Sequence, residues 1–289
     1  MQKVDRLVSA QWLYDNLSKV KVLDCSWYLP FMNRDVQKEF EDKHIPGAQF
    51  FDIDGIKDLQ KSDLPHMLPP PEFFGRSMDS FGIRNDDHVV VYDSAGVGPA
   101  CRVFWTFQAL GHDSVSVLNG GLPGWTAKGH KTDLGRASPK PTTGYKAHLI
   151  EPLVHEYDAV VKNIEQLKAS GGKTGKQIVD ARPNGRFTGK EPEFRPGLSS
   201  GHMPHSINVP FMQVTNGSEL KSPEELRKVF EGAGVDLGHP TILSCGSGVT
   251  ASVLYFALLN AGVDRKNLSV YDGSWTEYAL NPKSEIIKD

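Results

Sequence analysis

The chain has 289 residues, about twice the length of a typical domain, so two domains are expected. Hydrophobic residues make up 39% and charged residues 23% of it, a composition typical of globular proteins with sizeable cores. The net charge of −3 excludes the basic surface that nucleic acids and anionic membranes attract, and no apolar run is long enough to span a bilayer. We therefore expect neither nucleic acid nor a membrane as a partner.

The N-terminus and the cysteines bear on the compartment. The first residues, MQKVDRLVSAQWLYDNL, lack the apolar core of a secretory signal, and Asp5 and Asp15 are atypical of a mitochondrial presequence. Three cysteines, Cys25, Cys101 and Cys245, are too few for a disulfide framework and too far apart for a paired metal site. We expect a cytoplasmic protein without metal or cofactor; a processed mitochondrial protein remains an alternative.

Short strand patterns alternate with helical patterns along the chain. Helices are expected at 9–18, 71–80 and 223–231. Strands are expected within KVLDCSW, HVVVYDS and SVSVLNG, and then within KQIVDAR, PTILSCG and NLSVYDG. This alternation predicts an α/β fold, with parallel sheets flanked by helices.

The second series of segments repeats the first. VLDCSWY corresponds to IVDARPN, HIPGAQFFDID to HMPHSINVPFM, VVVYDSAGVGPA to TILSCGSGVTAS, and VLNGGLPGW to VYDGSW, at offsets between 152 and 158 residues. A period this long indicates two duplicated domains. We expect them to span residues 1–135 and 149–289, joined by the polar, glycine- and proline-containing linker 136–148.

The repeat places Asp93 of the first domain opposite Cys245 of the second. Because aspartate is a poor replacement for a buried thiol, we expect this position to face a cleft, with the chemistry in the second domain alone. His44 corresponds to His202, which favours a structural role for both histidines.

By the same alignment, Asn119 and Trp125 correspond to Asp272 and Trp275. The last two should close the pocket near the cysteine. Their presence in both domains favours an architectural role.

Cys245 lies between a predicted strand and a predicted helix that starts near Val249. Gly246, Ser247 and Gly248 allow successive backbone N–H groups to face an anion, and the helix N-terminus adds positive potential. Such a setting favours a thiolate, although most free cysteines are only small buried apolar residues. The glycines and the Asp93 counterpart favour a nucleophile.

The combination of CGSGVT, GHMPHSINVP and VYDGSW resembles the tandem rhodanese sulfurtransferases over essentially the whole chain. HIPGAQFFDID and VLNGGLPGW resemble the inactive half of that family. The resemblance implies that Cys245 carries sulfur as a persulfide, which the backbone of the following loop stabilises: Gly246, Gly248, Val249 and Thr250, with Ser247. Because most free cysteines in proteins are small buried apolar residues, Cys25 and Cys101 are interpreted as structural.

The donor is suggested by the loop after the cysteine. Family members that use thiosulfate carry basic residues there, whereas the neutral Gly246 and Ser247 are similar to enzymes that use 3-mercaptopyruvate. The resemblance thus implies sulfur transfer from 3-mercaptopyruvate to cyanide or to a thiol acceptor such as thioredoxin or a small thiol, with release of pyruvate. Thiosulfate as donor, or a sulfur relay for tRNA thiolation, remains open. A cysteine phosphatase is disfavoured, because Thr250 and Ala251 stand where its arginine is expected.

Three arginines follow the strand KQIVDA in the loop ARPNGRFTGKEPEFRPG: Arg182, Arg186 and Arg195. Guanidinium groups bind carboxylates with two parallel hydrogen bonds, which suits a 2-oxo acid. Alternatively, the arginines pair with Glu191 and Glu193 on a solvated loop. The resemblance assigns Arg186 and Arg195 to the substrate's carboxylate and keto group and gives Arg182 no such role.

Asp54 and His66 lie in the loop FFDIDGIKDLQKSDLPHMLPP of the first domain. Aspartates in such a loop usually cap turns. The resemblance instead implies that Asp54, His66 and Ser247 form a relay that polarises the substrate.

Overall fold

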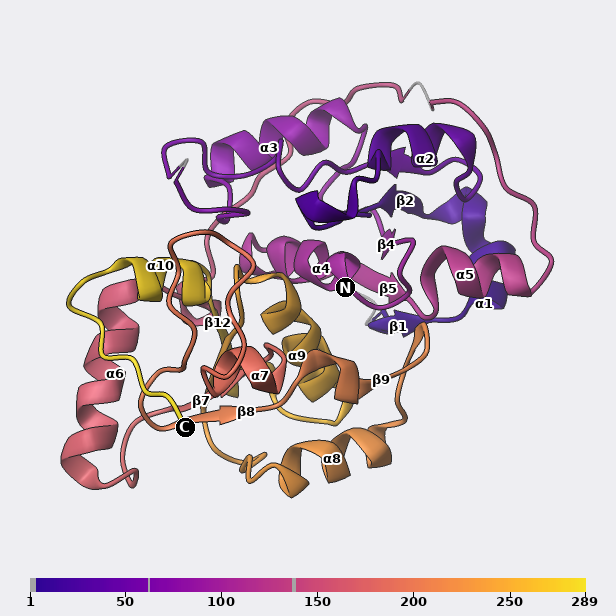
Figure 1. Cartoon of the computed structure of the whole chain (residues 1–289). Coiled ribbons are helices and arrows are strands. Elements are labelled where there is room, and N and C mark those ends of the chain that lie inside the picture. Colours follow the sequence, from indigo (N-terminus) through magenta and orange to yellow (C-terminus); the bar gives the residue numbers. More distant parts are fainter. Residues whose placement is uncertain (1–3, 62, 137–138) are drawn as a thin grey trace. The chain divides into compact units, whose positions relative to one another are not determined.

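The structure, a computed structural model, describes residues 4–61, 63–136 and 139–289. The described residues form two compact units: unit 1 is Met1–Gln60, Leu68–Ile150 and Thr215–Leu220, and unit 2 is Lys61–Met67, Glu151–Val214 and Lys221–Asp289 (Figure 1). The two units therefore exchange two short segments that a division at a single linker does not anticipate. Residues 137 and 138 of the predicted linker lie outside the described residues.

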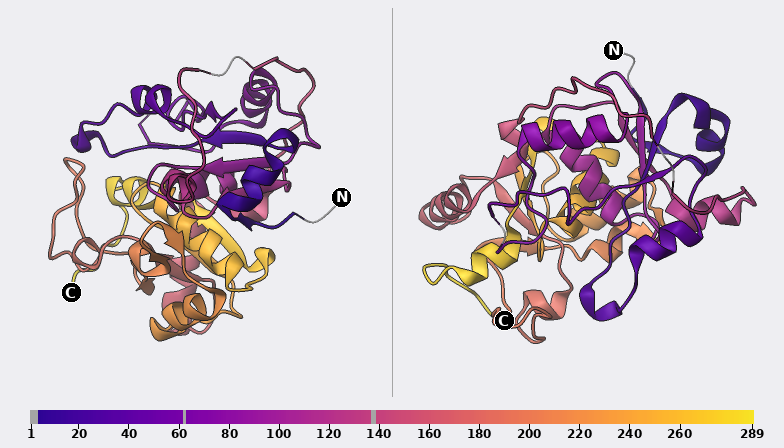
Figure 2. Two further views of the ribbon diagram at one scale, coloured as in Figure 1. Left: turned by 90° about the vertical axis from the view of Figure 1, so that its right-hand side faces the viewer. Right: turned by 90° about the horizontal axis from the view of Figure 1, so that it is seen from above.

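Unit 1 contains a five-stranded parallel sheet in the order β1-β5-β4-β2-β3. Helices α3 and α4 cover opposite faces of it (Figures 1 and 2). Its strands are β1 Leu7–Val8, β2 Lys21–Asp24, β3 Gln49–Phe50, β4 Val89–Tyr92 and β5 Val115–Leu118; its helices are α1 Ala10–Asn16, α2 Val36–Asp42, α3 Pro71–Ser80, α4 Pro99–Ala109 and α5 Gly121–Ala127, with 3₁₀ turns at Leu17–Lys19 and Pro30–Met32.

Unit 2 repeats this arrangement with a parallel sheet in the order β6-β12-β11-β7-β8. Its strands are β6 Val154–His155, β7 Gln177–Asp180, β8 Ser206–Asn208, β11 Thr241–Ser244 and β12 Leu268–Tyr271; its helices are α6 Tyr157–Ser170, α7 Asn184–Phe187, α8 Pro223–Gly232, α9 Val249–Asn260 and α10 Ser274–Leu280, with 3₁₀ turns at Glu151–Leu153, Phe211–Val214 and Arg265–Asn267. The equivalent strand orders confirm the predicted α/β fold with duplicated parallel sheets.

The central strand of each sheet and the helix after it form the core. Both β4 and β11 are buried at all four residues, as expected for parallel strands covered on both faces. Nearly all of α9 is buried, which explains why its sequence VTASVLYFALLN carries no polar face. The residue that follows each of these strands, Asp93 after β4 and Cys245 after β11, opens the loop that leads to the helix.

The described part of the predicted linker packs along unit 1. Thr142 N–H donates to the Asp79 carbonyl at 2.8 Å, and the Tyr145 hydroxyl lies 2.9 Å from Nδ1 of His112. Further on, His148 N–H donates to the carbonyl of Leu110 at 3.2 Å. These bonds make residues 139–150 part of the unit 1 structure, although their composition is that of a linker.

A two-stranded hairpin, β9 Thr215–Asn216 with β10 Glu219–Leu220, belongs to unit 1 although its sequence lies in the second repeat. Its Leu220 N–H donates to Oδ1 of Asn119 at 2.9 Å.

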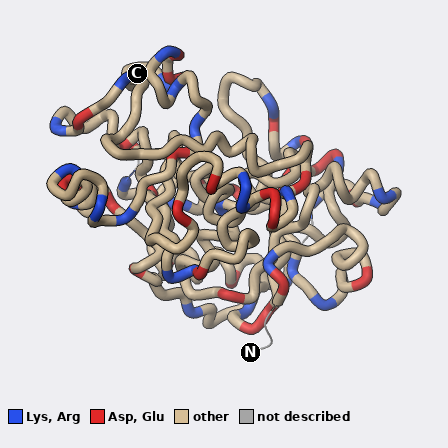
Figure 3. The backbone as a smooth tube through the Cα atoms, turned by 90° about the horizontal axis from the view of Figure 1, so that it is seen from below, with Lys and Arg blue, Asp and Glu red and all other residues tan. Residues whose placement is uncertain are grey.

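Basic and acidic residues are interspersed along the backbone (Figure 3). No helix in the described ranges is long and apolar enough to cross a membrane.

Candidate functional site

Cys245 follows β11 directly, and the loop Gly246–Gly248 connects it to α9. Gly248 has φ +80°, a left-handed conformation that glycine adopts at little cost, and it precedes the first helical residue Val249. Cys245 is only 1% exposed and Ser247 is 7% exposed. The thiol therefore sits at the carboxyl end of a central strand, where α/β sheets bind ligands.

The turn between β12 and α10 fixes the backbone of Cys245. Its N–H donates to Oγ of Ser274 at 3.2 Å, and its carbonyl accepts from the Trp275 N–H at 2.9 Å. The next carbonyl, of Gly246, accepts from both N–H and Oγ1 of Thr276, at 3.0 and 2.7 Å. Ser274 and Thr276 were missed by the sequence analysis, which singled out only their neighbours Asp272 and Trp275.

Unit 1 shows what the equivalent loop can hold. The carboxylate of Asp93 is fully buried and accepts hydrogen bonds from four backbone N–H groups of its own loop. Oδ1 accepts from Ala95 and Gly96 at 2.8 Å each, and Oδ2 accepts from Gly98 at 3.1 Å and Ala100 at 2.9 Å. The expectation that this position faces a cleft is wrong for Asp93. The loop makes burial of an aspartate tolerable because it supplies the donors that water would otherwise provide.

The same comparison corrects the alignment of the tryptophans. In unit 1, Leu122 N–H donates to the Asp93 carbonyl at 3.0 Å, as Trp275 N–H does to the carbonyl of Cys245. Leu122, not Trp125, is therefore the counterpart of Trp275. Trp125 uses its indole N–H differently, donating to the carbonyl of Lys131 at 2.8 Å. The sequence alignment paired the two tryptophans wrongly because VLNGGLPGW of the first repeat has three more residues than VYDGSW of the second.

The paired histidines have the structural role that their duplication predicted. Nδ1 of His44 lies 2.8 Å from the Phe40 carbonyl, and Nδ1 of His202 lies 2.9 Å from that of Phe187. Each imidazole also stacks on the ring of the same phenylalanine, with centroids 4.3 and 4.1 Å apart.

The three arginines after β7 divide into two kinds. Arg182 is 1% exposed, and its Nε and Nη2 donate to the Asp180 carboxylate at 2.6 to 3.1 Å. Its Nη1 donates to Glu193 at 2.8 Å. Burial alone would lower the pKa of Arg182, but the two carboxylates outweigh it and raise that pKa. Arg182 is thus part of the interior, in agreement with the absence of a predicted substrate role.

Arg186 and Arg195 lie around one aromatic ring. Their guanidinium carbons are 4.9 and 5.1 Å from the centroid of Phe194. Arg195 Nη1 donates to Oγ1 of Thr276 at 3.1 Å, and the same nitrogen would be 3.9 Å from a Cβ placed on Gly246. The structure therefore brings Arg195 beside the residue that follows Cys245.

The three members of the predicted relay are not assigned to one unit. His66 is 3% exposed and belongs to unit 2, as do Cys245 and Ser247, whereas Asp54 belongs to unit 1. His66 has φ +60°, a conformation that costs free energy for any residue other than glycine and that clusters at functional sites. Asp54 accepts from Trp27 Nε1 at 2.8 Å.

The other two thiols are unsuited to nucleophilic attack. Burial raises the pKa of both Cys25 and Cys101 well above its usual range, so both stay protonated. This agrees with their structural interpretation. Among the described residues, no group of three or more His, Cys, Asp and Glu is arranged to hold a metal.

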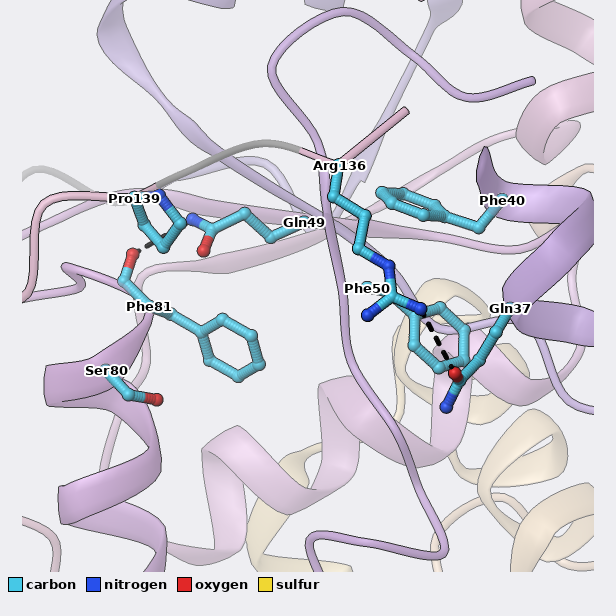
Figure 4. Close-up of a pocket in the computed structure, with 8 residues that line it drawn as sticks. All are labelled: Gln37, Phe40, Gln49, Phe50, Ser80, Phe81, Arg136 and Pro139. Carbon is cyan, nitrogen blue, oxygen red and sulfur yellow. Dashed lines mark hydrogen bonds between the residues drawn. The ribbon is translucent and has the colours of Figure 1, made fainter. Parts of the chain in front are cut away.

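Of the cavities in the described part of unit 1, two are lined by residues of α2. One, of about 510 Å³, is lined by Ser94 and Leu122 but not by Asp93. The other, of about 250 Å³, is bounded by aromatic rings and by an Arg136–Gln37 hydrogen bond of 3.4 Å (Figure 4). Neither contains a residue of the predicted site.

Comparisons with known proteins identify the family. A model of the rhodanese-like domain matches twice, at residues 9–128 and 163–281. Human 3-mercaptopyruvate sulfurtransferase is 39% identical over 97% of this chain and 94% of its own length, and rat thiosulfate sulfurtransferase is 41% identical over 94% and 91%. The Escherichia coli structure of SseA, described as a 3-mercaptopyruvate sulfotransferase with the rhodanese fold, superimposes with a TM-score of 0.82 at 35% identity, covering 94% of this chain and 99% of that one. The chain belongs to the rhodanese family and carries two rhodanese-like domains in tandem.

Proposed function

We propose that this chain is a 3-mercaptopyruvate sulfurtransferase, which moves sulfur from 3-mercaptopyruvate to a thiol acceptor and releases pyruvate. The observation that carries the proposal is the position of Arg195 beside the neutral loop that follows Cys245. A guanidinium there can hold the carboxylate of a 2-oxo acid while its thiol group faces the cysteine.

In the proposed reaction, Arg186 and Arg195 bind the substrate carboxylate and keto oxygen. The Cys245 thiolate attacks the substrate sulfur, and a sulfur–sulfur bond forms as the carbon–sulfur bond breaks. The electron pair of the broken bond remains on the pyruvate enolate, which then takes up a proton. The persulfide on Cys245 passes its outer sulfur to an acceptor thiolate, which restores the Cys245 thiolate.

The loop of unit 1 supports a role for the backbone in this chemistry. Ala95 and Gly96, which donate to the Asp93 carboxylate, correspond to Ser247 and Gly248. By this alignment of the two sequences, the N–H groups of Ser247 and Gly248 are the candidate donors to an anionic sulfur on Cys245. We therefore assign stabilisation of the thiolate and the persulfide to the N–H groups of residues 246–250.

The proposed relay of Ser247, His66 and Asp54 would polarise the substrate keto group and help to stabilise the enolate. The burial of His66 and the left-handed conformation of its backbone support its part in the relay.

Overall sequence identity does not distinguish 3-mercaptopyruvate from thiosulfate as the sulfur donor. The human and rat relatives are named for different donors but are almost equally similar to this chain. The neutral residues Gly246 and Ser247 favour 3-mercaptopyruvate, since the dianion thiosulfate would gain from added positive charge there. Measuring kcat/KM with both donors tests the choice. A higher kcat/KM with thiosulfate would overturn it.

The covalent step is tested by mass spectrometry after incubation with 3-mercaptopyruvate. We expect one added sulfur on Cys245, none on Cys25 or Cys101, and no pyruvate release by Cys245→Ser. Pyruvate formation with unmodified Cys245 would contradict the mechanism. A sulfur-relay role would be favoured if the wild-type protein accepted sulfur from a partner but did not turn over 3-mercaptopyruvate.

Thioredoxin is the acceptor that we propose, with small thiols as the alternative. Such acceptors are available in a reducing compartment, the cytoplasm or the mitochondrion. Measuring turnover with reduced thioredoxin against a small thiol at equal thiol concentration tests this choice.

A further inference from the structure

Glu193 lies between the buried Arg182 and the predicted substrate-binding Arg186. Its side chain is 2% exposed, and its two oxygens accept from different guanidinium groups: Oε1 from Arg182 at 2.8 Å and Oε2 from Arg186 at 3.3 Å. A buried carboxylate shared in this way fixes the relative position of two cations.

Arg182 is the fixed end of this arrangement. Its Nη2 bridges the Asp180 carboxylate at 2.6 Å and the Gly201 carbonyl at 2.7 Å, and its guanidinium carbon lies 4.0 Å from the ring centroid of Trp275. With every nitrogen of Arg182 engaged, Glu193 is held on that side by a group that cannot rotate. Glu193 in turn connects Arg186 to the buried Arg182, and so to the core of unit 2.

Arg186 is the exposed end. Its side chain is 18% exposed, and the hydrogen bond that the described structure gives it runs from Nη1 to Glu193. A guanidinium has five N–H donors in a rigid plane, so a contact at Nη1 orients the remaining donors without consuming them. Phe194 limits the tilt of that plane from one side.

We propose that Glu193 is a positioning residue for the reaction, which sets the orientation of the Arg186 guanidinium toward the substrate's carboxylate. The inference rests on the proposed function. The proposal predicts that removal of the Glu193 carboxylate weakens substrate binding, which is the opposite of what its charge alone would cause. Glu193 is an anion near the binding site of an anionic substrate, so if only its charge mattered, removing it would strengthen substrate binding.

The test compares Glu193→Gln with Glu191→Gln. Glu191 lies in the same loop and is exposed, so both substitutions remove one negative charge, but only the first breaks the contact with Arg186. We expect Glu193→Gln to raise KM for 3-mercaptopyruvate and lower kcat, reducing kcat/KM by about 10- to 100-fold. Glu191→Gln should stay within about twofold of the wild type. A lower KM at unchanged kcat in Glu193→Gln, or equal behaviour of the two variants, would overturn the inference.

Two further variants guard against a purely structural loss. Glu193→Asp keeps the charge but shortens the reach, and we expect it to fold and to show an intermediate kcat/KM. In an Arg186→Gln background, Glu193→Gln should lower kcat/KM no further, because Glu193 acts through Arg186. A full additional loss there would contradict the inference. If the wild type itself fails to turn over 3-mercaptopyruvate, the proposed function fails instead, so the two failures are distinguishable.

Discussion

Ser274 shows how a single residue links backbone conformation to the cysteine loop. It has φ +49°, and its hydroxyl accepts from the Cys245 N–H at 3.2 Å and donates to the Tyr271 carbonyl at 2.8 Å. The corresponding residue of unit 1 is Gly121, with φ +52°. Glycine adopts this conformation freely, whereas serine must be held in it by its hydrogen bonds.

This difference predicts an unusual order of stability at position 274. Ser274→Ala loses both side-chain hydrogen bonds and keeps the unfavourable φ, so we expect unit 2 to lose about 1–3 kcal/mol. Ser274→Gly loses the same bonds but relieves the backbone, and should be about 1 kcal/mol more stable than the alanine variant. Urea denaturation measures both values. An alanine variant as stable as the glycine variant would show that the backbone here is unstrained.

At the scale of elements, strand β6 carries a titratable group at the edge of the unit 2 sheet. Burial, and then the charge of Lys176, lowers the pKa of His155 from 6.5 to about 4. Its Nε2 lies 3.2 Å from Nζ of Lys176, so the imidazole must be neutral to accept this hydrogen bond. In the unfolded chain the same imidazole binds a proton at a higher pH.

Folding stability should therefore fall between pH 6.5 and about 4. In that window the unfolded chain binds more protons at His155 than the folded one, so protonation favours unfolding, with a slope of up to about 1.4 kcal/mol per pH unit. The stability is fully present above pH 6.5 and is lost as the pH falls. His155→Gln, which cannot titrate, should show a smaller decrease between pH 7 and pH 5 in urea denaturation. Identical decreases in the two proteins would refute the assignment.

The elements that the sequence could predict are those with strong local patterns. The apolar runs at β4, β11 and β12, and the start of α9 at Val249, lie where composition and periodicity indicate them. The two-residue strands β1 and β3, the four-residue helix α7 and the hairpin β9–β10 carry no such pattern, because tertiary hydrogen bonds determine them.

The candidate site shows the same division between local and tertiary information. The repeat located the Cys245 loop, and the resemblance selected Arg186 and Arg195. Neither the repeat nor the resemblance pointed to Ser274 and Thr276, because these residues matter through hydrogen bonds to a loop that lies about thirty residues earlier. Nor could residue type reveal that Asp93 is buried, because the four backbone donors that stabilise it are a property of the folded loop.

At the scale of the whole molecule, two short segments belong to the unit that does not contain their neighbours in sequence. One of them, Thr215–Leu220, lies against the Asp93 loop of unit 1. Gly96 marks this close approach: it has φ +118°, and a Cβ added there would collide with the backbone oxygen of Ser218. Since backbone cannot move aside as a flexible side chain does, only glycine fits at this position.

Gly47, also in unit 1, is the matched control, with φ +75° and open space around an added Cβ. Gly47→Ala should cost about 1 kcal/mol, because it adds only the left-handed conformation of a non-glycine residue. Gly96→Ala adds the collision with the hairpin, and we expect it to cost at least about 2 kcal/mol more. It should also expose the hairpin to proteolysis, whereas Gly47→Ala should not, because only the first displaces Thr215–Leu220. Equal unfolding free energies and equal cleavage of the two variants would mean that the hairpin contributes nothing to the stability of unit 1.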